Sequence, residues 1–77
     1  MKDFKWRKSD GDWLLFHKSS SFYIAIIHNH FKNGQYYVDV YYDPELREEF
    51  LEKDLDVAKL KAEIKAAEFL KANDYDL

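Results

Sequence analysis

The stretch that decides the fold is residues 26–42, IIHNHFKNGQYYVDVYY, in which Asn33-Gly34 separates two runs of mainly β-branched and aromatic residues. An Asn-Gly pair readily supplies the two positive φ angles of a two-residue type I′ turn. The residues on either side are of the types that strands prefer. The pattern therefore predicts a tight β-hairpin, with strands over residues 22–31 and 36–42.

A two-residue turn fixes the register, and the register decides which side chains share a face of the sheet. One face is mostly apolar, and we expect it to lie under a helix. Its expected cross-strand pairs are Phe31/Tyr36, Asn29/Val38, Ile27/Val40 and Ala25/Tyr42. The expected pairs on the opposite face are His30/Tyr37, His28/Asp39 and Ile26/Tyr41.

A second hairpin is predicted around Asp10-Gly11, which separates strands over residues 3–8 and 13–18. Ser19-Ser20-Ser21 is a short link to the next strand. The expected pairs are Trp6/Leu15 and Lys8/Trp13 on the core side, and Arg7/Leu14 and Lys5/Phe16 on the other side. The four strands together predict an antiparallel β-meander.

A helical segment is predicted over residues 43–73. Asp43-Pro44-Glu45 combines an N-cap residue, a proline suited to the first helical position and an acid in the first turn. Two apolar sets follow at helical spacing but out of phase: Leu46, Phe50 and Leu51, then Val57, Leu60, Ile64, Ala67 and Leu70. We therefore expect a break near residues 53–56, with Asp54 or Asp56 as the cap.

The whole chain is expected to form a single α+β domain over residues 1–77, with the helix packed on one face of a four-stranded sheet. With 77 residues and no cysteine, the core depends on packing alone, and 47% of the residues are apolar and 18% aromatic. Association into a dimer would add stability. No signal peptide and no apolar stretch long enough to span a bilayer is visible, so a cytoplasmic protein is expected.

Charge is unevenly distributed along the chain. Residues 1–38 carry six basic and three acidic groups, whereas residues 39–77 carry six basic and twelve acidic groups. Residues 39–56 hold eight of the acids. This region is either a solvated surface or an acidic patch that docks in a basic groove of a partner.

His28 and His30 lie two residues apart on a predicted strand, so both point to one face, and Asp39 is expected opposite His28. Two imidazoles and a carboxylate could bind a divalent metal, which would make the chain a metal-dependent hydrolase. However, a catalytic zinc site usually takes three protein ligands with supporting contacts, and a cross-strand His-Asp pair is also an ordinary stabilising contact. The chain also lacks phosphate-loop, nucleophile-elbow and HExxH motifs. We expect a protein that is not an enzyme, with no metal and no cofactor.

The sheet face opposite the helix is the expected interaction surface, because apolar area left open on a small domain usually marks one. Three partners are considered, in this order: another protein, a second copy of the chain, and single-stranded nucleic acid. In the last case tyrosines would stack on bases while Lys5, Arg7 and Lys18 contact phosphates. The net charge of −3 argues against nucleic acid.

The order of these features resembles a class of small phage and prophage proteins. The resemblance is carried by Trp6, Gly11, Trp13-Leu14-Leu15, the aromatic run 36–42, and the helix with Ala58-Lys59 and Ala66-Ala67-Glu68. Some small phage proteins of this size and fold class inhibit host defence, and they include anti-CRISPR proteins. The acidic residues 43–56 depart from the plainer pattern.

The resemblance implies a binding protein that inhibits a host protein, such as a nucleic-acid-handling CRISPR effector, in the host cytoplasm. The residues expected to bind the partner are Tyr37, Tyr41, His28, His30, Asp43, Glu45, Glu48, Glu49 and Glu52, with the acids imitating phosphates. The alternative functions are a single-stranded nucleic-acid-binding protein and the metal-dependent hydrolase.

Overall fold

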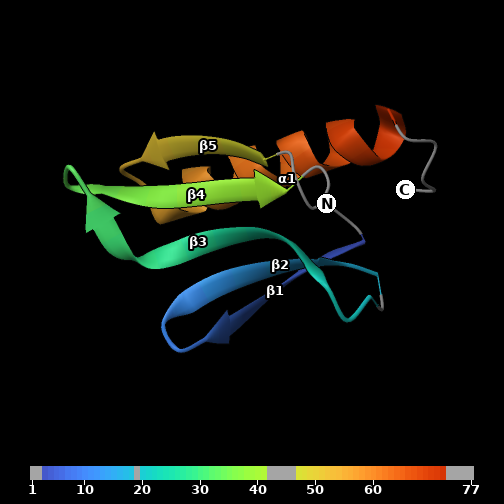
Figure 1. Cartoon of the computed structure of the whole chain (residues 1–77), viewed down its shortest axis with the longest axis horizontal. Coiled ribbons are helices and arrows are strands. Elements are labelled where there is room, and N and C mark those ends of the chain that lie inside the picture. The colour runs from blue at the N-terminus through green and yellow to red at the C-terminus, as the bar shows by residue number, and fades with distance from the viewer. Residues whose placement is uncertain (1–2, 19, 42–46, 73–77) are drawn as a thin grey trace.

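The structure is a computed structural model, and it describes residues 3–18, 20–41 and 47–72. In these ranges the chain forms one antiparallel sheet in the order β1-β2-β3-β4-β5, followed by a helix (Figure 1). The elements are β1 (Phe4–Ser9), β2 (Asp12–His17), β3 (Tyr23–Lys32), β4 (Gln35–Tyr41), β5 (Arg47–Glu52) and α1 (Leu55–Ala72). The predicted α+β meander with a C-terminal helix is therefore confirmed, but with five strands instead of four.

Both predicted two-residue turns are present. Asp10 and Gly11 have φ values of 53° and 87°, and Asn33 and Gly34 have φ values of 56° and 72°. These positive angles are the ones that a type I′ turn requires. In the first hairpin the predicted register is confirmed, because the structure pairs Lys5/Phe16, Trp6/Leu15, Arg7/Leu14 and Lys8/Trp13.

The fifth strand replaces the first part of the predicted helix. Residues Arg47–Glu52 pair with β4 along its length, from Tyr41/Arg47 to Tyr36/Glu52. Glutamate and leucine favour a helix, but propensity is a weak determinant, and pairing gives the row of backbone donors and acceptors along β4 its partners. Pairing therefore overrides local propensity here. The predicted start at Asp43-Pro44-Glu45 and the predicted contact of Leu46 lie outside the described residues.

The helix begins where the second predicted helical segment was expected to begin. Asp54 is the N-cap, because its Oδ1 accepts a hydrogen bond from the backbone N–H of Val57 at 3.0 Å. The backbone oxygen of Asp54 accepts from the N–H of Ala58 at 2.9 Å. The chain thus passes from a strand to a single helix at the position where the sequence predicted a break between two helices.

The register of β3 against β4 differs from the prediction beyond the turn. Phe31/Tyr36 is paired as predicted, but the strands then shift by two residues, and the next pair is Ile27/Val38. Ala25 lies opposite Val40, and Ile26 lies opposite Asp39. The predicted pairs Asn29/Val38, Ile27/Val40 and Ile26/Tyr41 are therefore wrong, and the pair Ala25/Tyr42 is replaced by Ala25/Val40. The predicted backbone pair His28/Asp39 is wrong too, because Asp39 lies opposite Ile26.

Asn29 explains this irregularity. Its backbone N–H donates to Asp12 Oδ1 at 2.7 Å, and its Nδ2 donates to the backbone oxygen of Asp10 at 2.8 Å. Asn29 therefore binds the first turn instead of lying under the helix as predicted. A bulge of this kind bends a strand and increases its twist.

Alanine substitutions at the two turn glycines should show how much stability is lost through backbone strain and how much through a clash with Asn29. Both glycines have a positive φ, but only Gly11 lies against Asn29. A Cβ at Gly11 would lie 3.0 Å from the Cβ and Nδ2 of Asn29, whereas a Cβ at Gly34 meets nothing within 4 Å. Gly34→Ala should lower the free energy of unfolding by about 1 kcal/mol through strain alone, and Gly11→Ala by about 2 kcal/mol or more. Urea denaturation of both variants measures the difference. Equal losses would mean that the Asn29 contact adds nothing.

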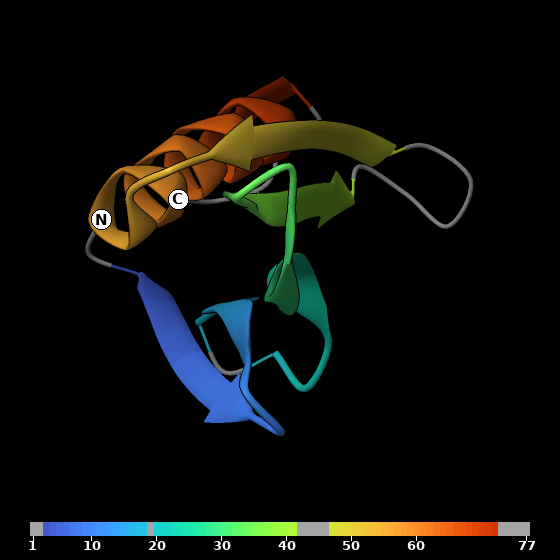
Figure 2. The same ribbon diagram turned by 90° about the vertical axis from the view of Figure 1, so that its left-hand side faces the viewer.

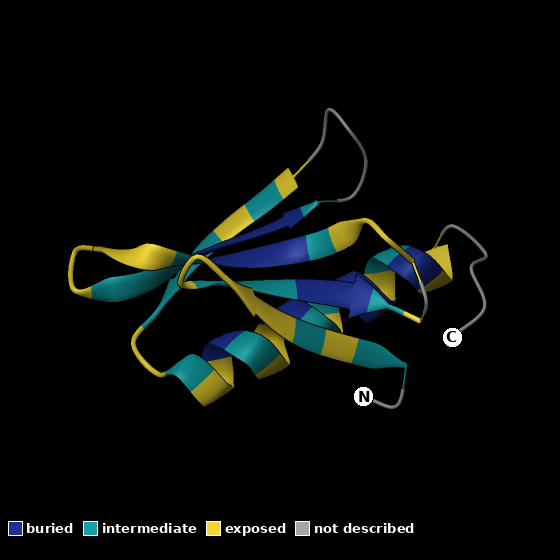
Figure 3. Cartoon of the chain, turned by 90° about the horizontal axis from the view of Figure 1, so that it is seen from below, coloured by how far each residue is buried: buried dark blue, intermediate teal, exposed yellow. Residues whose placement is uncertain are grey.

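The core lies between the sheet and the helix. It consists of Leu15, Ala25, Ile27, Val38, Val40, Ala58, Ala62 and Ala66, all at most 1% exposed. Figure 2 shows the strand direction turning from β5 to β1, with α1 along the β5 side of the sheet. In Figure 3 the buried segments gather on the central strands and on one side of the helix, whereas β1 is mostly exposed. The predicted apolar pair Trp6/Leu15 belongs to this side.

The helix buries only the last two residues of the predicted stripe, Ala67 and Leu70. Ala58, Ala62, Ala66 and Ala67 face the core with Leu70, whereas Val57, Leu60 and Ile64 remain 39%, 55% and 41% exposed. The sheet supplies the bulk, since its large rings pack against the same cluster: Phe4, Trp6, Trp13, Tyr36 and Phe50. Small residues on the helix match large residues on the sheet, because a core must be filled without voids or overlap.

Candidate protein-binding face

The sheet face that points away from α1 is here called the open face. Its described members follow from strand alternation and from the register, which place them on the side opposite the alanine stripe. They are Lys5, Arg7, Leu14, Phe16, Tyr23, Ile26, His28, His30, Tyr37, Asp39, Tyr41, Arg47, Glu49 and Leu51. The helix covers only the other face, as predicted.

Three ring side chains form a cluster at one end of the open face. The rings of His28 and Tyr37 stack with centroids 4.9 Å apart and planes 18° apart. His30 lies 5.3 Å from His28 and 6.3 Å from Tyr37. Lys32 Nζ is 5.0 Å from the Tyr37 ring. His28, His30 and Tyr37 are called the ring cluster below, and the predicted neighbourhood of His30 and Tyr37 is confirmed.

A second group of rings crosses the same face near the other end of β4. Tyr41 meets Tyr23 edge-on at 5.9 Å, and Tyr23 meets Phe16 edge-on at 6.5 Å. Such edge-to-face pairs are favourable arrangements for aromatic rings. Partial burial of Tyr41 removes water from its hydroxyl and so raises the pKa of that hydroxyl. Tyr41 is therefore half-buried among its neighbours, whereas Tyr23 is 42% exposed.

Asp39 sits beneath this face and connects its polar groups. It is 2% exposed, and its Oδ2 lies 2.7 Å from His28 Nε2 and 4.0 Å from Arg47. Its Oδ1 is buried and has no hydrogen-bond partner among the described residues. The predicted His28/Asp39 contact is confirmed. Asp39 therefore holds the His28 ring in the position from which it stacks on Tyr37.

The open face is less apolar than predicted. Ile26 and Phe16 were expected to contribute exposed apolar area, but each is only 8% exposed. In the observed register Ile26 lies between Leu14 and Asp39, in the middle of the sheet. The side chains of this face that reach solvent are therefore mainly rings with polar atoms and charged groups.

The acids that were expected to form one patch are divided between the two faces of β5. Glu48 forms an ion pair with Lys65 of the helix, and Glu52 accepts a hydrogen bond from Lys61 at 2.7 Å. The hydrogen bond from Lys61 lowers the pKa of the Glu52 carboxyl. Glu49 points to the open face and pairs with Arg47 at 3.0 Å. Asp43 and Glu45 lie outside the described residues.

Glu49 also links the acidic strand to the ring cluster. A hydrogen bond between the Tyr37 hydroxyl and Glu49 raises the pKa of that hydroxyl. Arg47 pairs with Glu49 and lies near Asp39, and the nearby carboxylates raise the pKa of its guanidinium.

The prediction did not include Arg47 and Tyr23 among the candidate residues. Residues 47–52, REEFLE, show no alternation of polar and apolar residues, so the sequence offered no signal for the strand that carries Arg47.

The structure does not bring His28, His30 and Asp39 together as the ligands of one metal ion. His28 bonds directly to Asp39, and His30 instead lies beside Tyr37. Over residues 3–18, 20–41 and 47–72, no three histidine, cysteine, aspartate or glutamate side chains are grouped so as to hold a metal ion.

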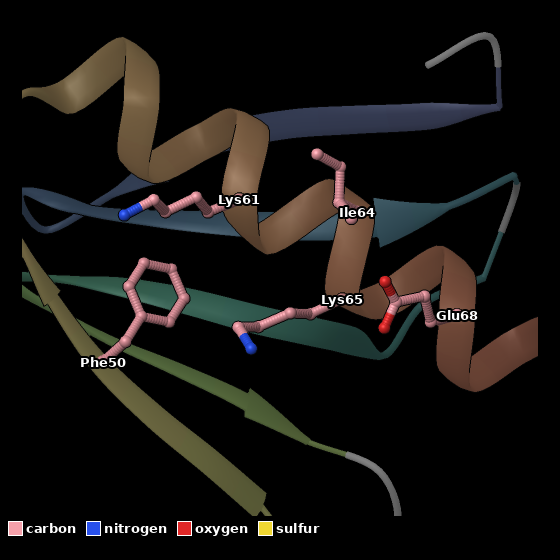
Figure 4. Close-up of a pocket in the computed structure, with 5 residues that line it drawn as sticks. All are labelled: Phe50, Lys61, Ile64, Lys65 and Glu68. Atoms are coloured by element: carbon pink, nitrogen blue, oxygen red, sulfur yellow. The ribbon is translucent and has the colours of Figure 1, made fainter.

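A hollow of about 330 Å³ lies on the helix side, where Phe50, Lys61, Ile64, Lys65 and Glu68 line it (Figure 4). Lys65 Nζ is 5.9 Å from the Phe50 ring in this hollow.

The fold and the open face define a small α+β protein with one uncovered sheet face rich in rings. Comparison with protein families, with curated proteins and with solved structures found no match to this chain. Within the described part of the chain, no helix has both the length and the apolar character needed to cross a membrane.

Proposed function

We propose that this chain is a non-enzymatic binding protein that docks on another protein through the ring cluster and Tyr41, with Glu49 of β5 beside them, and inhibits the protein it binds. The observation that carries the proposal is the ring cluster itself. Three rings with polar atoms lie on an uncovered sheet face and hold one another at centroid distances of 4.9–6.3 Å.

Such rings suit a docking surface because aromatic side chains give large contact area at a small entropic penalty. Here the penalty is smaller still, since the contacts of His28 with Tyr37 and Asp39 restrict these rings before a partner arrives. Tyr37 lies at the point where the rings meet the acids, because its hydroxyl bonds to Glu49. Polar and apolar contacts can therefore be made by one patch.

The chemistry of the partner is proposed from the charge of this region. Of the eight acids in residues 39–56, Glu49 is exposed on the open face, and Asp54 and Asp56 are exposed where α1 begins. Complementarity favours a basic surface, of the kind found on proteins that handle nucleic acid. The resemblance to small phage proteins supports a host defence protein of this kind, such as a CRISPR effector.

A binding role is favoured over catalysis by the position of Asp39. It is the carboxylate nearest to a histidine on this face, but it is 2% exposed and already bonded to His28. A general base must come within hydrogen-bond reach of the proton that it removes. A substrate on the open face has no access to this carboxylate.

The proposal is tested by affinity capture from nuclease-treated bacterial lysate with the wild-type chain, Tyr37→Ala and Phe22→Ala. Phe22 is the matched control, because it is an aromatic residue that is 80% exposed and lies outside the ring cluster. We expect a protein that the wild type and Phe22→Ala retain and that Tyr37→Ala loses. With the purified partner, Tyr37→Ala should raise Kd by about 30-fold, the effect of a hot-spot residue.

A partner that Tyr37→Ala still retains as well as the wild type does would contradict docking through the ring cluster. Glu49→Gln gives a second readout, because it removes one charge without touching the ion pairs of Glu48 and Glu52 with the helix. It should slow association and weaken the salt dependence of binding. An inhibition assay on the captured protein then tests the inhibitory role separately.

A further inference from the structure

A hollow of about 180 Å³ lies on the open face at the β1 and β2 side of the sheet, away from the ring cluster. It is lined by Lys5, Arg7, Phe16, Lys18 and Ser20. Three of these five side chains are cationic at neutral pH and none is acidic. The docking face proposed above does not use this hollow.

The local fold explains why the cations converge. Lys5 and Arg7 are two residues apart on β1, so they point to the same face about 6–7 Å apart, and Lys5 pairs with Phe16 of β2. Lys18 has a φ of 55°, and its backbone N–H donates to the backbone oxygen of Asp3 at 2.8 Å. Ser20 is held by a hydrogen bond from its N–H to the His17 oxygen at 3.2 Å. The lining is thus built from positions whose backbone is fixed.

The charges in this hollow favour an anion. Among the described residues, neither Lys5 nor Arg7 forms an ion pair with a carboxylate, whereas Lys61 and Lys65 of the helix do. The Arg7 guanidinium lies 5.5 Å from the centre of the Phe16 ring. A cation–π contact of this kind uses none of the guanidinium N–H groups as a donor to an oxygen, so they can still donate to an anion. An anion in the hollow would relieve the mutual repulsion of Lys5 and Arg7.

We propose that this hollow binds the phosphate group of a nucleotide. Arginine and lysine together are the usual ligands of phosphate oxygens, and the hollow offers both. The next residues along the chain supply exposed rings, since Phe22 is 80% and Tyr23 is 42% exposed. Ser20 Oγ accepts a hydrogen bond from the backbone N–H of Phe22 at 3.2 Å, which places that residue next to the hollow. A base can stack on these rings while its phosphate occupies the hollow.

The test is a titration of the isotope-labelled full chain, followed by NMR, with inorganic phosphate, adenosine monophosphate or a short oligothymidylate, at constant ionic strength. We expect saturating shifts of the Lys18 and Ser20 amides with phosphate but not with the same ionic strength of sodium chloride. Adenosine monophosphate and the oligonucleotide should bind more tightly than inorganic phosphate. Each of Lys5→Gln and Arg7→Gln should raise Kd by about 10-fold, the effect of losing one charge-assisted hydrogen bond.

The matched control is Lys53→Gln, which removes one exposed cation between β5 and α1, outside the lining of the hollow. It should change Kd by less than twofold. Absence of saturating shifts at Lys18 and Ser20, or equal weakening by Lys53→Gln and Arg7→Gln, would overturn the site. Equal affinities for inorganic phosphate and adenosine monophosphate would overturn its assignment to a nucleotide. Tyr37→Ala should bind phosphate as the wild type does, so failure of the docking face and failure of this site are distinguishable.

Discussion

Replacing Ala62 by leucine is expected to lower the free energy of unfolding by about 3 kcal/mol, the upper end of the usual effect of overpacking. Ala62 is fully buried where the helix approaches the sheet, and Ala58 and Ala66 lie one turn away on the same stripe. A larger side chain there would push the helix away from rings that fill the space around this stripe. Denaturation by urea, with the slope of the transition compared between variants, measures the loss.

The matched control for this substitution is Leu60→Ala on the same helix. Leu60 is 55% exposed, so its truncation should change the free energy of unfolding by only about 0.5 kcal/mol. This order is the reverse of what the apolar spacing of the helix predicts, because that spacing placed Leu60 in the core. A larger loss from Leu60→Ala than from Ala62→Leu would mean that the helix packs through its larger residues.

Replacing His28 by alanine is expected to lower the free energy of unfolding by about 2–3 kcal/mol. The substitution leaves Asp39 buried without its 2.7 Å partner, and the other oxygen of this carboxylate already has no partner among the described residues. Arg47, at 4.0 Å, compensates only in part. Thermal or urea denaturation at neutral pH gives the value.

His30→Ala is the matched control, because His30 is exposed and two residues away on the same strand. It should change the free energy of unfolding by no more than about 0.5 kcal/mol. In the variant that combines His28→Ala with Asp39→Val, the loss should be smaller than the sum of the two single losses, because no carboxylate is then left buried. Additive losses would show that the His28–Asp39 contact contributes no coupling.

The sequence predicted the hairpins well because their turns are determined locally. Asp10-Gly11 and Asn33-Gly34 adopt the positive φ angles that their residue types favour, and the first hairpin has the predicted register throughout. The contact between His28 and Asp39 was also found, although the register around it shifts by two residues. The side chain of His28 reaches Asp39 even though the backbone of Asp39 pairs with Ile26.

The errors arose where partners distant in sequence decide the structure. Residues 47–52 have helix-favouring composition, but the open edge of β4 recruits them as a strand. Asn29 leaves the predicted pairing because it donates hydrogen bonds to the carboxylate of Asp12 and to the backbone oxygen of Asp10. The alanine stripe of the helix was missed because hydrophobicity alone ranks Val57, Leu60 and Ile64 above it. Only the large rings of the sheet show why small residues are needed there.

The order of the strands has a consequence for how quickly the chain reaches this structure. Each strand pairs with the strand that precedes it, and two of the connections are turns of only two residues. Chain segments that must meet are therefore already close together, and closing such short loops costs little entropy. Small proteins with mostly local contacts fold faster than those that join remote segments. Rapid folding from either hairpin limits the time for which the unpaired, ring-rich strands are exposed to association with other chains.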